Sequence, residues 1–188
     1  MTAKSEGPFP NMSNTAHRQG CWWLLDVETS GLDRERDSVI ALRLARLEQL
    51  KAVEERTILV RPEKPLTPWA EKLTGISNWD LEQALPLEDA LVQLEAVRGC
   101  SLFLDRGFTR PFLESAYGRC GREFSLCYLA LDCLLEQLGI PSRQGNRKLL
   151  EALPSPPRSW PDTPPKDTEL ARLYQLTRAI FYWLEGTQ

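Results

Sequence analysis

Two carboxylates, Asp26 and Glu28, stand two residues apart where the apolar run 22–25 gives way to the small-residue turn 29–31. Side chains alternate across a β-strand, so both carboxylates point to one face if this stretch is extended. Two acids at the end of a buried strand repel each other and lose hydration unless a cation lies between them. The pair therefore predicts a divalent-metal site. The alternative is a strand that simply leaves the core and enters a polar turn.

Composition limits the classes of protein that this chain fits. Its 188 residues suit one domain, expected over 21–188 and preceded by a flexible leader over 1–20. A net charge of −3 argues against a strongly basic nucleic-acid binder, although a local basic groove stays open. No apolar run approaches the roughly 20 residues that span a bilayer. The five cysteines form no Cys-x-x-Cys pair, so we expect reduced, mostly buried thiols in a cytoplasmic protein and no zinc site.

The elements that must position the acids follow a mixed strand and helix order. We expect strands near 21–28, 38–47 and 55–60, the last two joined by a connection over 49–54, and a strand at 100–104. The stretch 124–130 fits a strand or a helix, and we expect a short strand there. Helices are expected over 68–73, 86–97, 111–118, 132–138, 146–153 and 167–185, with a proline-rich loop at 154–165. Asp167 or Thr168 is placed to cap the last helix. A meander followed by alternating strands and helices indicates an α/β fold with a mixed sheet.

The motif around the acid pair resembles that of a known enzyme family. Leu25-Asp26-Val27-Glu28-Thr29-Ser30-Gly31-Leu32, followed downstream by Leu73-Thr74-Gly75-Ile76-Ser77, is similar to the DnaQ-like (DEDD) 3′–5′ exonucleases. The similarity runs in order from about residue 22 to residue 184. It implies an RNase H-like sheet of about five strands, an antiparallel meander followed by parallel strands, flanked by helices.

The resemblance also implies a reaction and a set of site residues. In this family two divalent ions about 4 Å apart, Mg²⁺ or Mn²⁺, clamp the attacking water and the leaving 3′-oxygen of a phosphodiester. Asp26 and Glu28 then correspond to the first two acids. The backbone at Thr29, Gly31 and Leu32 is expected against the terminal nucleotide of a single-stranded DNA or RNA 3′ end.

The second family motif departs from the pattern. It matches residues 104–113, where Phe108, Phe112 and Leu113 agree but Thr109 replaces the metal-binding acid. Asp105 takes the place of the family's asparagine and is a candidate substitute ligand. Arg106 and Arg110 belong to a basic stretch that predicts either a phosphate-binding rim or an ordinary mixed surface, and Phe108 is a candidate nucleic-acid contact.

The third family motif, a histidine followed five residues later by an aspartate, is also altered. One alignment puts Asp167 at the aspartate position and Asp162 at the histidine position; another aligns Lys166 and Ala171 and retains no catalytic group. His17, the protein's one histidine, lies in the leader. Because acid–base help is worth about 10²–10⁴-fold, such losses predict weak or absent catalysis.

Three hypotheses follow from the sequence. The first is a slow exonuclease that uses Asp26 and Glu28 with Asp105 and Asp167. The second is a pseudo-exonuclease that binds a 3′ end without cutting it. The third is a protein-interaction module for a protein partner. Trp69, Trp79 and Trp160 lie in or beside loops, where they either stack on bases or, as we expect, are buried.

Overall fold

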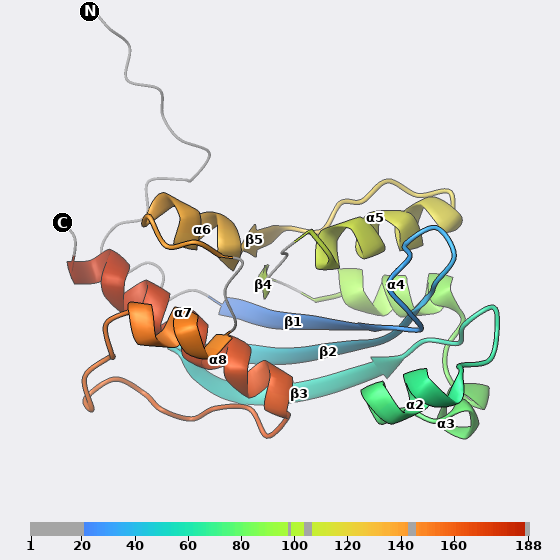
Figure 1. Ribbon diagram of the computed structural model, residues 1–188, viewed down its shortest axis with the longest axis horizontal. Helices are drawn as coiled ribbons and strands as arrows, with labels where there is room; N and C mark the ends of the chain where they lie inside the picture. Colours follow the sequence, from blue (N-terminus) through green and yellow to red (C-terminus); the bar gives the residue numbers. More distant parts are fainter. Residues whose placement is uncertain (1–20, 98, 104–106, 143–145, 187–188) are drawn as a thin grey trace, which may run out of the picture.

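A five-stranded sheet forms the centre of the protein (Figure 1). The computed structural model describes residues 21–97, 99–103, 107–142 and 146–186. The strand order is β3-β2-β1-β4-β5, where β1 is Cys21–Thr29, β2 is Val39–Glu48, β3 is Lys51–Leu59, β4 is Cys100–Phe103 and β5 is Tyr128–Ala130. Strands β1 to β3 pair antiparallel, and β1, β4 and β5 pair parallel. The predicted mixed sheet is confirmed.

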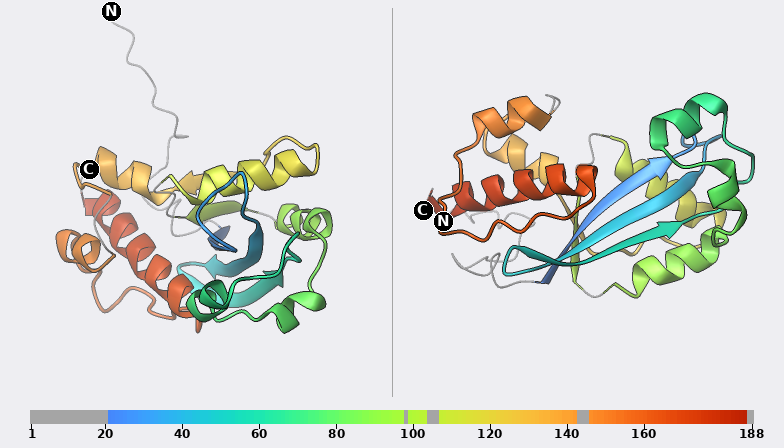
Figure 2. Two further views of the ribbon diagram at one scale, coloured as in Figure 1. Left: turned by 45° about the vertical axis from the view of Figure 1, so that its right-hand side comes forward. Right: turned by 90° about the horizontal axis from the view of Figure 1, so that it is seen from below.

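Helices cover both faces of this sheet (Figure 2). One face packs against α6 (Leu131–Gln137), α7 (Asn146–Ala152) and α8 (Thr168–Gly186). The other packs against α4 (Leu87–Glu95) and α5 (Thr109–Arg119). Helices α2 (Pro68–Thr74) and α3 (Asn78–Glu82) follow the meander. Within the described ranges, no helix is long and apolar enough to cross a membrane.

Strand β1 is apolar without alternation because it is buried on both sides. Leu24 packs into the cluster with α8, whereas Leu25 and Val27 pack into the cluster with α4 and α5. Alternation then places Asp26 and Glu28 on the α8 side. The two acids therefore lie where the apolar contacts of that face end.

The predicted connection over 49–54 is wrong, because β2 and β3 are joined by two residues. Gln49 and Leu50 both adopt left-handed backbone conformations, with φ of 50° and 60°. Such a turn matches the twist of the flanking strands, but its usual Asn-Gly signature is missing here. Burial of the Leu50 side chain, which is 1% exposed, compensates for the strained backbone.

Two expectations about burial are also wrong. Cys21, Cys127 and Cys133 are exposed, because they lie at strand ends or on the outer side of α6. Trp69 and Trp79 are 61% and 75% exposed on α2 and α3, which bury only Ala70 and Leu81. Trp160 is buried beneath the proline-rich loop, as expected.

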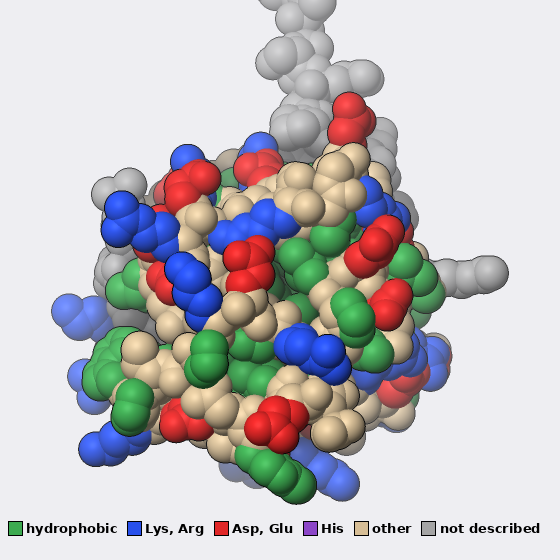
Figure 3. All heavy atoms as spheres, turned by 90° about the vertical axis from the view of Figure 1, so that its right-hand side faces the viewer, with side chains coloured by type: hydrophobic (Ala, Val, Ile, Leu, Met, Phe, Trp, Pro, Cys, Tyr) green, Lys and Arg blue, Asp and Glu red, His purple; other side chains and the backbone are tan. Residues whose placement is uncertain are grey.

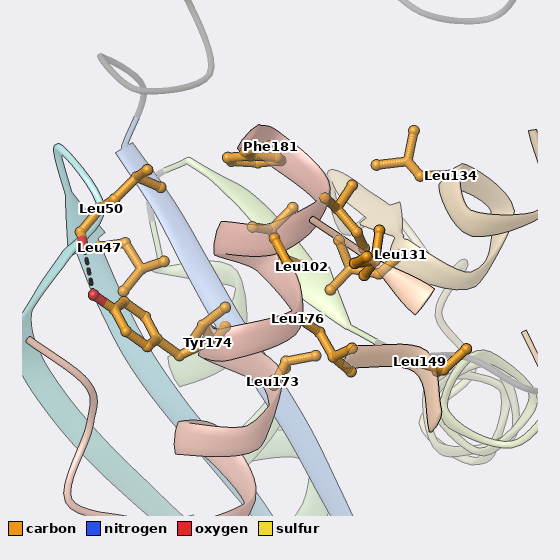
Figure 4. Close-up of a cluster of buried hydrophobic side chains, with 14 of the residues drawn as sticks. Leu47, Leu50, Leu102, Leu131, Leu134, Leu149, Leu173, Tyr174, Leu176 and Phe181 are labelled. Atoms are coloured by element: carbon orange, nitrogen blue, oxygen red, sulfur yellow. Dashed lines mark hydrogen bonds between the residues drawn. The ribbon is translucent and has the colours of Figure 1, made fainter. Parts of the chain in front are cut away.

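Tyr174 of α8 ties three segments together (Figure 4). Its hydroxyl donates to the Leu50 carbonyl at 2.9 Å and accepts from the Thr163 backbone N–H at 3.0 Å. The ring is fully buried among leucines of the sheet and α8. One hydroxyl thus joins α8 to the tight β2–β3 turn and to the proline-rich segment.

Replacing Tyr174 with phenylalanine should lower the free energy of unfolding by about 1–3 kcal/mol, since the buried Leu50 carbonyl and the partly buried Thr163 N–H lose their partner. Urea denaturation measures the change. Tyr182→Phe makes the same chemical change on the same helix at a half-buried position, and we expect it to be nearly neutral. Equal effects of the two substitutions would contradict the role of the Tyr174 hydroxyl.

Candidate functional site

Asp26 and Glu28 lie two residues apart near the end of β1, and both point to the α8 side of the sheet. Burial raises the pKa of the Asp26 carboxyl above its usual range, although nearby Arg43 acts in the opposite direction. Burial likewise raises the pKa of Glu28 to about 7, against the lowering effect of Arg43. Loss of hydration thus outweighs the attraction of Arg43, so both acids lie in a place that penalises negative charge.

The cation at this place is Arg43 of β2. It is the direct cross-strand neighbour of Asp26. Its Nη1 lies 3.1 Å from Glu28 Oε1 and 3.6 Å from Asp167 Oδ2. The three side chains are only 16%, 23% and 29% exposed, so water screens these contacts less than it screens surface ion pairs. One guanidinium therefore bridges the sheet and the start of α8.

The start of α8 is fixed in place by two carboxylates. Asp167 accepts the backbone N–H groups of Glu169 and Leu170 at 3.0 Å each through Oδ1, which is the geometry of an N-cap. Its other oxygen faces Arg43. Glu55 of β3 accepts the backbone N–H groups of residues 166 and 167 at 2.8 and 3.2 Å. Asp167 therefore caps the helix and faces the acidic site at the same time.

Thr109 stands where the second family motif would supply an acid. It is the first residue of α5 and is buried. The aromatic residues that match this motif, Phe108 and Phe112, contact each other with ring centroids 4.6 Å apart. A threonine hydroxyl is neutral and binds divalent ions weakly compared with a carboxylate. Asp105 and Arg106 lie outside the described residues.

The loop after β1, residues 30–38, is held by hydrogen bonds. Asp37 accepts the backbone N–H of Asp33 at 2.8 Å and the Ser30 hydroxyl at 3.3 Å. A Cβ at Gly31 would lie 2.3 Å from the Asp37 carboxylate, so a larger residue there would displace this carboxylate from its hydrogen bonds. The Thr29 hydroxyl donates to the Gly31 carbonyl at 2.6 Å. The small-residue turn therefore has a defined shape.

Helix α5 supports the same loop from outside. Arg119 donates to the carbonyl oxygens of Arg34 and Asp37 at 3.1 and 2.8 Å and to the Ser38 hydroxyl at 3.3 Å. Ser115 donates to the Arg34 carbonyl at 2.8 Å. The loop that follows the first motif is thereby tied to the helix that carries the second motif.

An open hollow lies beside this loop. Leu32, Asp33, Phe108 and Pro111 are among the residues that line it, and Leu32 is 78% exposed. Figure 3 views the end of the molecule toward which β1 points, where basic and acidic side chains are interspersed with apolar ones. Leu32 and Phe108, two of the predicted nucleic-acid contacts, therefore lie at one hollow.

Several arginines of the basic stretch are already paired. Arg110 pairs with Glu114 at 2.6 Å, and Arg122 pairs with Glu95. Asp162, which one alignment puts at the histidine position, accepts from the buried Arg178 at 3.0 Å. The pairs of Arg110 and Arg122 are typical of a mixed surface, and they leave less positive charge for phosphates than the sequence count suggests.

These residues do not fit a divalent ion as they are arranged. Oxygens of Glu28 and Asp167 face a guanidinium, which donates hydrogen bonds and cannot act as a metal ligand. In the described part of the chain, no group of three or more His, Cys, Asp or Glu side chains has a geometry that could hold a metal. The fold brings the acids together with the arginine Arg43, but the described side chains do not surround a position that a metal ion could occupy.

A protein-family model described as "Exonuclease" matches residues 24–123, more than half of the chain. The chain belongs to the exonuclease family. This match includes the acid pair, the meander and α5, so the DnaQ-like 3′–5′ exonuclease fold expected from the motifs is confirmed.

Relatives and solved structures of the exonuclease family agree with this assignment. A DNA polymerase III PolC-type protein from Caldanaerobacter subterraneus subsp. tengcongensis is 27% identical over 116 residues, which cover 61% of this chain and 8% of that protein. Exonuclease X in complex with 5′ overhanging duplex DNA superposes with a TM-score of 0.59 at 17% identity, covering 89% of this chain and 94% of the other. The nuclease domain of 3′hExo bound to rAMP gives 0.64 at 15% identity, covering 90% and 94%. The structural similarities show the fold.

Sequence reasoning missed two charged residues of this site. Arg43 interrupts an apolar strand, and the small residues Ala41 and Ala45 flank it on the same face, which leaves room for a long side chain. Glu169 of α8 raises the pKa of both Asp26 and Glu28. The sequence could have indicated Arg43, because it stands at a position of β2 whose side chain points into the protein. For Glu169 the sequence offered only its position two residues after the N-cap Asp167.

Substituting Arg119 with alanine should loosen the loop over residues 30–38, because three hydrogen bonds to it are lost. We expect amide hydrogen exchange there to accelerate about tenfold, with little change in β1 or β2. The control is Arg110→Ala, which removes another arginine of α5. Unchanged exchange in Arg119→Ala would show that α5 does not support the loop.

Proposed function

We propose that this exonuclease-family protein binds the 3′ end of single-stranded nucleic acid and has little or no capacity to cleave it. The observation that carries the proposal is that the first motif has its two acids, whereas the second motif lacks one. Asp26 and Glu28 keep their place on β1, whereas the second-motif position holds the buried, neutral Thr109. A two-metal hydrolysis that lacks one acid and a core histidine loses orders of magnitude in rate.

Binding is supported by the features that the first motif retains. The loop over 30–38 is rigidly tied, and Leu32 projects beside Phe108 where a terminal base has apolar surface to contact. Exonuclease X and the nuclease domain of 3′hExo, two proteins of similar fold, are bound to duplex DNA and to rAMP in their structures. We extend that chemical class, a nucleotide 3′ end, to this chain. The proposal covers DNA and RNA strands alike, and the cytoplasmic location stays a prediction.

A second candidate function is a protein-interaction module. It is favoured by three exposed apolar side chains on the neighbouring helices α2 and α3, Trp69, Leu73 and Trp79. Exposed aromatic residues on adjacent helices are typical of interaction surfaces. If Trp69 and Trp79 contact a protein partner and not nucleic acid, the double variant Trp69→Ala, Trp79→Ala should keep the affinity for nucleic acid unchanged.

Fluorescence anisotropy with short single strands tests the binding half of the proposal. At about 50 mM salt we expect a Kd near 10 µM or tighter for strands with a free 3′-hydroxyl, since contacts between cationic side chains and phosphates are screened least at low salt. Strands with a blocked 3′ end should bind more weakly. Absence of binding at low salt, or equal affinity for blocked ends, would contradict recognition of a 3′ end.

The cleavage half is tested by a gel assay of the same strands in Mg²⁺ and in Mn²⁺. We expect removal of 3′ nucleotides to stay at the level of an Asp26→Asn control, since the site lacks a full set of acids. Metal-dependent trimming that Asp26→Asn abolishes would overturn this half and favour the slow exonuclease.

Leu32→Ala should weaken binding about fivefold, because the exposed leucine no longer covers apolar surface of the terminal base. It should not change the unfolding midpoint, since Leu32 is 78% exposed. Val53→Ala removes another exposed aliphatic side chain, near the start of β3, and serves as the control. Equal affinities of the two variants would place the 3′ end elsewhere.

A further inference from the structure

We propose that Arg43 is a built-in cation of the acidic site, and that its guanidinium takes the place that divalent ions have in the exonuclease family. The inference rests on the family assignment and extends the proposed function, because it says what neutralises the acids that a two-metal site would use. It predicts a site that does not bind divalent ions as long as Arg43 is present.

Position and space favour a permanent role for Arg43. It lies in the middle of β2, paired with β1 on one side and with Thr57 of β3 on the other, so its backbone is fixed. Ala41 and Ala45 flank it on the same face and leave the stem unobstructed. Arginine keeps its charge at every physiological pH, unlike a bound ion whose occupancy depends on concentration.

Arg43 contacts the carboxylate oxygens that a metal ion would need as ligands. Its Nη1 faces Glu28 at 3.1 Å and Asp167 at 3.6 Å, and Asp26 is its cross-strand neighbour. The side chains of Arg43, Glu28 and Asp167 are largely shielded from water. A guanidinium withdrawn from such a place would leave carboxylates with uncompensated charge, which is unfavourable in a partly buried site.

The same arrangement opposes entry of a divalent ion. A second cation among Asp26, Glu28 and Asp167 would meet the fixed positive charge at short range in a poorly screened environment. Thr109 offers no additional negative charge to offset this repulsion. Arg43 thus explains how a cluster of acids persists in a family member with a reduced ligand set.

Titration with MnCl₂ alone, by calorimetry and by thermal unfolding, tests the inference. The unsubstituted protein should show no saturable binding and no shift in Tm. Arg43→Ala should be less stable without metal and should show saturable Mn²⁺ binding with a rise in Tm, because a like charge has been removed. Arg43→Gln, of similar length and uncharged, should gain the same response and serves if the alanine variant folds only with metal.

Two control variants make the result specific. Arg46→Ala removes an arginine of the same strand that pairs with Glu48 and Glu54 on the opposite face, and it should gain no Mn²⁺ response. Arg43→Lys keeps a charge and should also gain none. Saturable Mn²⁺ binding by the unsubstituted protein that Asp26→Asn removes would overturn the proposal, as would equal binding by the lysine and alanine variants.

This experiment separates the inference from the proposed function. Mn²⁺ binding is measured without nucleic acid, whereas 3′-end binding is measured by anisotropy in EDTA. If the strands fail to bind but the Arg43 variants gain Mn²⁺ sites, only the proposed function fails. If the strands bind only when Mn²⁺ is added to the unsubstituted protein, the built-in cation is refuted.

Discussion

The bridge from Arg43 to Glu28 and Asp167 brings one cation from β2 together with acids from β1 and from the start of α8. Without a positive charge, the acids on this face would repel each other in a region that already penalises ionisation. The docking of α8 and the survival of the acid pair therefore depend on the same interaction. Glu55, which accepts the backbone N–H groups before α8, reinforces that docking from β3.

At this site the protein shares the fold of the exonuclease family, but its charges differ from those expected for the family. The sheet order, the loop after β1 and the helix that carries Phe108 and Phe112 all belong to the exonuclease fold. The charges differ from those that the resemblance leads one to expect, because an arginine faces the acids and the neutral Thr109 is the residue that the sequence aligns with an acid of the second motif. An exonuclease-family scaffold is thus combined with an acid pair that faces an arginine, and this combination is the basis of the function proposed above.

Much of the fold was predictable because local patterns and long-range packing agree in it. The apolar run before Asp26, the amphipathic α4 and the capped α8 each carry their signal in a few adjacent residues. The β2–β3 turn was missed because its left-handed residues are Gln49 and Leu50, stabilised by burial of Leu50 rather than by glycine. Arg43 was missed for a related reason: its partners come from β1 and α8, and only the three-dimensional packing brings them together.

The central claim, that an arginine takes the place of the metal, is tested most directly by a crystal of the unsubstituted protein grown with millimolar Mn²⁺. An anomalous difference map at the manganese absorption edge would locate any bound ion. The account predicts no peak between Asp26 and Glu28, with the Arg43 guanidinium still facing Glu28 and Asp167. A manganese peak ligated by Asp26 and Glu28, with Arg43 turned away, would contradict it.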